Sequence, residues 1–314
     1  MNLMQRDSSL DFFRAIVVVL FVFFNMLATF VLAENIPVLL THNVHNTLLP
    51  LDFVASAFAF ILGAGLLFSF ENKFKKFGIE AIAKYGKRFV LLSLIGIFLD
   101  GIFANGLLGS AIHWGVLQSL GVAGLVAIPF LAVRNNRLRI AVAGLLAGVY
   151  AFAIYGKSID FGIAEMTTHG GIVGAIGYGI VSVFGVICAS YLLRGKRNYL
   201  PVIGVALIAV SIYASQTIPF DKWTVSISYA LISAGVAAIV WYLLGLVKFG
   251  EGSRVMEVVN VLGRNSLLFW ILQYLLVWYP PVFVKLWGVY PLALGAGIAL
   301  AVVVLFYLIT KKMS

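Results

Sequence analysis

The chain has 314 residues, of which 62% are hydrophobic and only 11% are charged, and its formal net charge is +10. This composition excludes an ordinary soluble domain, because long uncharged runs that recur through a chain are typical of membrane spans. The single cysteine, Cys188, excludes an internal disulfide and a cysteine-based zinc site. The positive charge could indicate nucleic acid, but a multi-pass membrane protein gathers Lys and Arg in its cytoplasmic loops, so no nucleic-acid partner is expected.

Ten apolar segments are long enough, or nearly so, to cross the hydrocarbon core, which takes about 20 helical residues. Each is predicted to be helical, because lipid offers no partner for backbone polar groups. The first run is too long for the core of a signal peptide, so we expect it to be retained. We predict an all-α, polytopic membrane protein that forms a single domain over residues 1–314. The segments are residues 10–33, 49–70, 87–104, 112–133, 138–155, 170–193, 199–216, 223–246, 257–279 and 290–310.

The distribution of basic residues predicts the orientation in the membrane. Of the 22 Lys and Arg, 17 fall in the N-terminal segment, the C-terminal segment and the loops of one side. The opposite side holds only Lys157, Lys222 and Lys285. By the positive-inside rule both termini are therefore predicted to be cytoplasmic, and the first loop to face outward.

The first segment carries three polar residues on nearly one helix face. Asp11 and Arg14 are three residues apart and can pair, and Asn25 follows eleven residues later, close to three full turns. At 1.5 Å per residue, Asn25 lies roughly 16 Å further toward the outer side. An anchor plus an amide that ties helices together would explain them, and a functional site is the alternative.

The outward loop, Thr41 to Asp52, concentrates polar chemistry at the edge of the bilayer. It contains His42 and His45, and a neutral imidazole is the commonest general base or nucleophile near neutral pH. Asp52 follows Pro50 at the start of the second segment. Its carboxylate could orient a histidine, or it could only be stabilised by the helix N-terminus.

A zinc site is the weaker interpretation of the two histidines. Their spacing would suit two metal ligands, but a third ligand must come from Asp52, His113 or His169. That requires the outer loops to converge, so no metal is expected. Elsewhere, Asp100, Gln118 and Gln273 are predicted to make hydrogen bonds between helices.

Several stretches in chain order resemble the heparan-α-glucosaminide N-acetyltransferase family of transmembrane acyltransferases. The first is SLDFFRAIVVVLFVFFN (Ser9 to Asn25), which is similar to the family's opening helix. His42, Asn46 and Asp52 match the spacing His-x3-Asn-x5-Asp before the family's next helix. The later stretches that resemble the family are FVASAFAFILGAG (53–65), GVLQSLG (115–121), GGIVG (170–174) with Gly185, KWTVS (222–226) and GRNSLLFW (263–270).

The resemblance implies transfer of an acetyl group from cytosolic acetyl-CoA to an amino sugar across the membrane. It implies that His42 is the catalytic histidine, that Asn25 lies at the acetyl group and that Asp52 supports the histidine. Asn25 would stabilise the oxyanion of the thioester carbonyl. The basic inner loops are candidates for the phosphates and adenine of the donor. The predicted donor-binding residues are Arg14, Lys84, Lys87, Arg88, Gln118, Arg264 and Asn265, with Lys73 and Lys76 as further candidates.

Three departures from the family pattern leave the acceptor and part of the donor pocket open. Ser119 stands where the family often has Arg, Gln273 where it often has His, and His169 with Gly170 replaces a Pro-Glu pair. A secondary transporter or channel with the polar residues along its path is the competing class, and a non-catalytic scaffold is a third. We expect an acceptor that is an amino sugar or small amine, and the plasma membrane of a prokaryote. A homodimer stays open.

Overall fold

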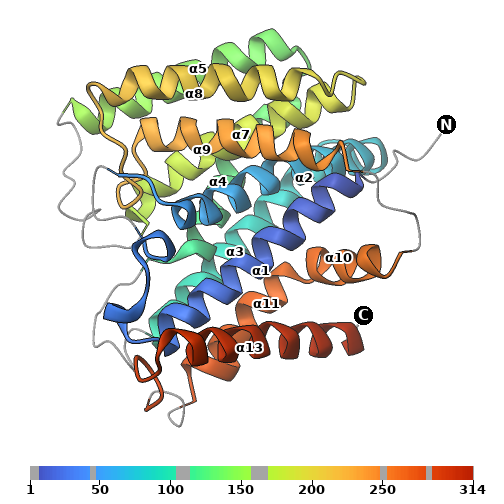
Figure 1. The fold of residues 1–314 in the computed structure, drawn as a ribbon. Helices are drawn as coiled ribbons and strands as arrows, with labels where there is room; N and C mark the ends of the chain where they lie inside the picture. Colours follow the sequence, from blue (N-terminus) through green and yellow to red (C-terminus); the bar gives the residue numbers. More distant parts are fainter. Residues whose placement is uncertain are drawn as a thin grey trace. The chain divides into compact units, whose positions relative to one another are not determined.

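The structure is a computed structural model that describes residues 7–42, 47–103, 114–156, 169–247, 253–280 and 285–313. The described residues are mainly helical and contain no β-strand (Figure 1). Their one isolated β-bridge pairs Val31 with Tyr290. The predicted all-α class is therefore confirmed.

The helices form two compact units. Unit 1 is built mainly from residues 55–243, and unit 2 from residues 7–43, 49–54 and 244–314. The prediction that the chain is one domain stays a prediction.

Unit 1 is organised around the buried helix α7, Gly171–Leu192, which packs against α4 and α5. Glycines permit this close packing: a Cβ at Gly185 would meet the carbonyl oxygen of Phe60, and one at Gly179 would meet Val126. Ser182 of α7 also donates to the carbonyl of Ala59 at 2.7 Å. The glycine-rich start of the sixth predicted segment is thus a helix-packing surface. The other helices of unit 1 are α2 (Phe53–Phe77), α3 (Glu80–Phe103), α4 (Val116–Ala132), α5 (Asn136–Tyr155), α8 (Tyr199–Ser215) and α9 (Ile227–Leu244).

Unit 2 is organised around α1, Ser8–Phe30, which packs against α10, α11 and α13. The helix begins where Asp7 accepts the backbone N–H of Leu10 at 2.8 Å, an N-cap that satisfies one unpaired donor of the first turn. The remaining elements of unit 2 are η1 (Ala33–Asn35), η2 (Val38–Leu40), η3 (Pro50–Asp52), α10 (Arg254–Arg264), α11 (Ser266–Gln273), η5 (Tyr274–Trp278) and α13 (Leu292–Met313).

The helices α1 and α13 run antiparallel, as the contacts at their two ends show. At one end, the backbone N–H of Gly288 donates to the carbonyl of Thr29 at 2.9 Å, just before α13. At the other end, Gly263 approaches the carbonyl of Asp11, and Lys311 pairs with Glu257 of α10 at 2.8 Å. The start of α1 and the end of α13 therefore lie at the same end of unit 2.

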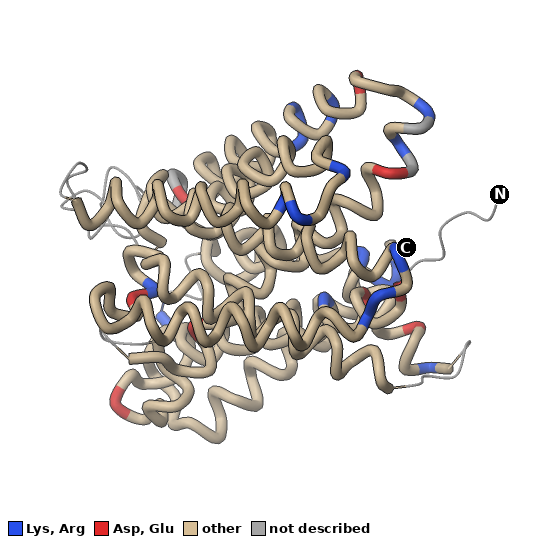
Figure 2. Tube along the Cα trace, turned by 90° about the horizontal axis from the view of Figure 1, so that it is seen from above, with Lys and Arg blue, Asp and Glu red and all other residues tan. Residues whose placement is uncertain are grey.

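Among the described residues, six helices are long and apolar enough to cross a membrane, or seven if one bent pair is counted as a span. Lys and Arg lie mostly near helix ends and loops, and long stretches of helix carry no charge (Figure 2). The protein is therefore a multi-pass membrane protein, while ten spans stay a prediction. The six helices are Ser8–Phe30, Pro50–Glu71, Asn136–Tyr155, Gly171–Leu192, Ile227–Leu244 and Leu292–Met313.

Nine of the ten predicted segments overlap one helix each, but the ninth, residues 257–279, is not a single helix. It breaks at Asn265, and α10 lies at 64° to the helix that follows. The side-chain amide of Asn265 donates to the carbonyl of Val261 at 2.8 Å and so binds a carbonyl of the last turn of α10.

Candidate functional site

Two residues that carry the predicted chemistry of the loop after α1 form a pair. Nδ1 of His42 lies 3.2 Å from Oδ1 of Asp52. The Asp52 side chain is fully buried, whereas 46% of the His42 side chain is exposed. A carboxylate can only accept, so Nδ1 donates this bond, and in a neutral imidazole the lone pair is then on Nε2. This arrangement fixes one ring nitrogen of His42 against the carboxylate of Asp52, and the predicted catalytic role of the histidine stays a prediction.

The Asp52 carboxylate is also held by the local backbone, independently of His42. Pro50 occupies the first position of the short helix η3, where its missing N–H costs nothing. Asp52, two residues later, accepts the backbone N–H of Leu49 through Oδ2 at 2.9 Å. Oδ2 of Asp52 therefore binds the backbone at the start of the helix, and Oδ1 binds His42. The contacts that both interpretations of Asp52 require are therefore present, and its role in supporting a catalytic histidine stays a prediction.

Asn25 makes a second polar pair in unit 2, within the span α1. Its Nδ2 atom donates to Oε1 of Gln273 at 3.0 Å, and the Gln273 side chain is buried. This bond ties α1 to α11, as an amide inside a helix bundle often does. The amide nitrogen of Asn25 has two hydrogens, so one remains for another acceptor.

Two tryptophans border this amide pair along the interface of α1 with α11 and η5. Phe21 packs against Trp270, with ring centroids 4.0 Å apart and the ring planes tilted by 33°. At the other side, Nε1 of Trp278 donates to the hydroxyl of Thr29 at 3.1 Å. Residues Tyr274 to Trp278 form a π-helical turn directly after Gln273, and such turns are frequent at functional sites.

The predicted donor residues of unit 2 gather near the start of α1. Arg14 donates to Asp11 at 3.1 Å, which confirms the predicted pair. The close approach of Gly263 to the backbone of Asp11 brings Arg264 and Asn265 to this end of the helix. Arg264 is exposed. This end of unit 2 can therefore present guanidinium groups to an anionic ligand.

The predicted donor residues of unit 1 lie on α3 and α4. Lys84, Lys87 and Arg88 are exposed on α3, and the Lys84 ammonium lies 3.5 Å from the centroid of the Phe77 ring. Gln118 of α4 donates to the buried carboxylate of Asp100 at 2.6 Å, which confirms the predicted bond between helices. Gln118 therefore links α4 to α3, and its role in binding a donor stays a prediction.

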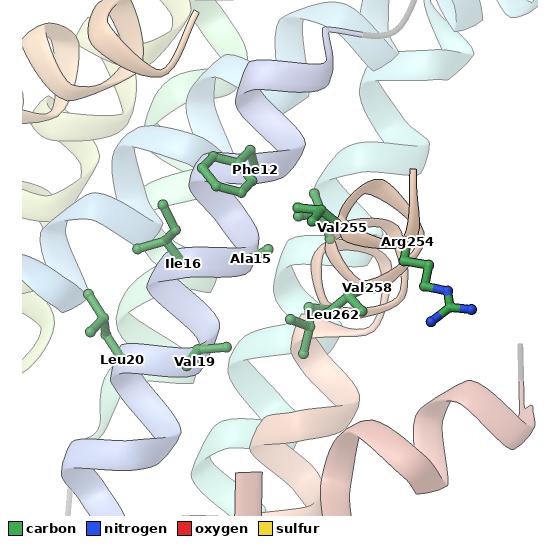
Figure 3. A pocket seen from close by; sticks show the side chains of 10 residues that line it. Phe12, Ala15, Ile16, Val19, Leu20, Arg254, Val255, Val258 and Leu262 are labelled. Atoms are coloured by element: carbon green, nitrogen blue, oxygen red, sulfur yellow. The ribbon is translucent and has the colours of Figure 1, made fainter. Parts of the chain in front are cut away.

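Unit 2 also has an apolar groove of about 460 Å³ between α1 and α10. Phe12, Ile16 and Leu20 line one side, and Val255, Val258 and Leu262 line the other (Figure 3). The guanidinium of Arg254, at the rim, points away from α1 (Figure 3). Because its walls are almost wholly hydrocarbon, the groove offers no hydrogen-bond partners for a phosphate group.

Three candidate residues lie outside the described part of the chain: His45, Asn46 and His113. His169 is described, and its Nδ1 lies 3.3 Å from the hydroxyl of Tyr178 in unit 1. No cluster of three or more His, Cys, Asp or Glu suited to a metal ion occurs in the described ranges. The expectation that no metal takes part stays a prediction.

The structure thus brings His42 to Asp52 and Asn25 to Gln273 within unit 2. It also brings Gly263, which precedes Arg264 and Asn265, to the backbone of Asp11, the partner of Arg14. The sequence alone did not indicate that Trp270, Trp278 and Thr29 lie around the Asn25–Gln273 pair. A signal for Thr29 was present as a regular spacing, because Phe21, Asn25 and Thr29 are each four residues apart and share one face of α1.

The comparison with family models gives one match, described as heparan-alpha-glucosaminide N-acetyltransferase, catalytic, over residues 6–169. The comparison with curated proteins gives no match. The matched region contains Asn25, His42 and Asp52, whereas Gln273 and the GRNSLLFW stretch lie beyond it. The matched residues make up more than half of the chain. This multi-pass membrane protein therefore belongs to the heparan-alpha-glucosaminide N-acetyltransferase family.

Proposed function

We propose that this protein moves an acetyl group from cytosolic acetyl-CoA to an amine or hydroxyl on the opposite side of the membrane. In this proposal His42 is the catalytic base or nucleophile. The observation that carries it is the pairing of His42 with Asp52. A buried carboxylate held by a backbone N–H and directed at Nδ1 is the arrangement that orients a histidine for base catalysis.

The chemical step balances with these residues alone. Nε2 of His42 takes a proton from the acceptor, and the acceptor nitrogen or oxygen attacks the thioester carbonyl carbon. The new C–N or C–O bond forms as the C–S bond breaks, and the CoA thiolate leaves and takes the proton that Nε2 of His42 removed from the acceptor, which restores the neutral imidazole. In the alternative route His42 itself accepts the acetyl group and passes it on. Both routes need the same free nitrogen.

Asn25 is proposed to stabilise the charge that develops on the thioester oxygen. Its bond to Gln273 fixes the amide and leaves a second hydrogen for an oxyanion. One such donor, held in place beforehand, is worth roughly 3 kcal/mol in the transition state. The acetyl carbonyl would therefore lie beside Asn25, within reach of the attacking acceptor.

The donor is proposed to enter from the basic side of the membrane. Ten spans with both termini in the cytoplasm would put Arg14, Arg264 and the α3 residues Lys84, Lys87 and Arg88 on that side. In unit 2 the start of α1 and the end of α13 share one end, as termini on one side require. The thioester would then reach Asn25, roughly 16 Å along α1 from Arg14.

The acceptor is proposed to be an amino sugar or a small amine at the outer face of a plasma membrane. His42 is half-exposed, so a polar acceptor can approach Nε2. The prokaryotic setting is part of the same proposal.

Thermal unfolding of the purified protein with acetyl-CoA, CoA and dephospho-CoA tests the donor. A ligand at 100 times its Kd stabilises the folded state by about 2.7 kcal/mol. We expect a clear rise in Tm with acetyl-CoA and CoA. The absence of any shift would contradict acetyl-CoA as the donor.

Transfer of labelled acetyl from acetyl-CoA to glucosamine and small amines, in proteoliposomes, tests the role of His42. We expect His42→Gln to slow transfer by roughly 10²–10⁴-fold, and His169→Gln, the matched control, to change it little. Full activity in His42→Gln would refute the proposed role. Flux of a solute without acetyl-CoA dependence would instead favour the transporter alternative.

A further inference from the structure

Trp270 is the feature of unit 2 that the proposed mechanism does not use. Its side chain is only 5% exposed, and its indole Nε1 has no hydrogen-bond partner among the described residues. An indole N–H can only donate, and a buried donor without an acceptor costs free energy. Such a group calls for an explanation, and an acceptor on a bound ligand is one.

The neighbouring Trp278 shows that the same interface can satisfy an indole. Its Nε1 donates to the hydroxyl of Thr29, on the same helix α1 that Trp270 faces through Phe21. Trp270 faces the ring of Phe21, which has no acceptor atom, whereas Trp278 faces the hydroxyl of Thr29. The interface therefore provides an acceptor for the indole N–H of Trp278 but, within the described ranges, none for that of Trp270.

The position of Trp270 indicates which part of a bound ligand would contact its indole N–H. Trp270 precedes Gln273 by three residues, and Phe21 precedes Asn25 by four, so each pair shares one face of its helix. Trp270 thus lies about one helical turn, or roughly 5 Å, from the Asn25–Gln273 pair along the interface. The displacement is toward the end of unit 2 that holds Arg14 and Arg264.

We infer that the indole N–H of Trp270 donates a hydrogen bond to the first amide carbonyl of the pantetheine arm of acetyl-CoA. This inference rests on the proposed function. In acetyl-CoA the thioester carbonyl and that amide carbonyl are separated by the cysteamine unit, which spans roughly 6 Å when extended. A thioester at Asn25 therefore puts the amide oxygen at the level of Trp270. The rest of the arm continues toward the basic residues.

The test compares matched tryptophan variants of the full-length protein by isothermal titration with CoA and acetyl-CoA, and by transfer kinetics. Trp270→Phe removes the N–H and keeps an aromatic ring. We expect it to raise Kd and KM for the donor about tenfold, with kcat within about twofold of wild type. Trp278→Phe should lower Tm, because it breaks the bond to Thr29, and leave Kd within about twofold.

A second replacement guards against misfolding of Trp270→Phe. Benzothienylalanine at position 270 has sulfur in place of the indole N–H and almost the same shape. We expect the same rise in Kd, and the same weakening for S-acetyl-N-acetylcysteamine, which keeps only the thioester and the first amide. An unchanged Kd in both replacements would overturn the inference while acetyl-CoA binding to the wild type upholds the donor. A wild type that binds no CoA would overturn the proposed function and the inference with it.

Discussion

Nδ2 of Asn25 donates to Oε1 of Gln273 at 3.0 Å, so two amides 248 residues apart in the chain share a hydrogen bond inside unit 2. The bond ties α1 to α11, and it also orients the amide that we propose as the oxyanion donor. In this proposal Asn25 has both a structural and a catalytic role, and the two roles predict different results for single and double variants.

We predict that stability depends on the pair and that catalysis depends on Asn25. Gln273→Leu leaves Asn25 without its partner and should lower the free energy of unfolding by about 1–2 kcal/mol. The double variant Asn25→Leu/Gln273→Leu should recover most of that loss, because no buried amide is left unpaired. Transfer should fall roughly 10²–10³-fold in Asn25→Leu and in the double variant. Thermal unfolding checks the predicted stabilities, and transfer kinetics check the predicted rates. A double variant with full activity would mean that Asn25 only links two helices.

Asp52→Asn is expected to impair catalysis although the side chain keeps its size. Asp52 accepts from His42 and from the backbone N–H of Leu49 with its two oxygens. Asparagine has one acceptor oxygen, so it cannot serve both donors. We expect a loss of roughly 10²–10⁴-fold in kcat and about 1 kcal/mol in stability.

Asp7→Asn is the matched control for this carboxylate. Asp7 caps α1 by accepting from Leu10, and asparagine caps a helix about as well as aspartate. Transfer should therefore stay within about twofold of the wild type. If Asp7→Asn and Asp52→Asn lowered kcat equally, the special role of Asp52 would be lost.

Local patterns in the sequence predicted the parts of the site that depend on short separations. The i,i+3 spacing predicted the Asp11–Arg14 pair, and the concentration of polar residues in the first outer loop pointed to His42 and Asp52. The positions of the helices followed from the apolar runs. These features depend on neighbours along the chain, which the sequence displays directly.

The pairing of Asn25 with Gln273 could not be predicted in the same way. Gln273 was expected to bond another helix, but hydropathy assigns no partner to a polar residue in a span. The break at Asn265 was missed because the apolar run contains no proline there. The charged residues of α10 are the signal for this break, because Arg254, Glu257 and Arg264 alternate with apolar residues at helical spacing.

Glycine packing in unit 1 predicts a large difference between two similar substitutions. In Gly185→Ala, the new methyl group would meet the carbonyl oxygen of Phe60 and push α7 from α2, at a cost of about 1–3 kcal/mol. Gly144, within α5, has open space where its Cβ would lie. Gly144→Ala should be neutral or gain up to about 1 kcal/mol from helix propensity. Equal Tm values for the two variants in nanodiscs would contradict this packing of α7.

The proposed orientation makes a labelling prediction that uses the single native cysteine. Cys188 is buried in α7, so it should react poorly, and Cys188→Ser gives a clean background. Leu39 is 65% exposed in η2, before His42, and Ile79 is 79% exposed between α2 and α3. A membrane-impermeant maleimide should label Leu39→Cys in intact cells and Ile79→Cys only after permeabilisation, because the basic residues around α3 predict a cytoplasmic position. Both substitutions spare every Lys and Arg, so the charge pattern is unchanged. The reverse labelling would place His42 on the same side as the donor, and transfer across the membrane would then no longer be the function that this site supports.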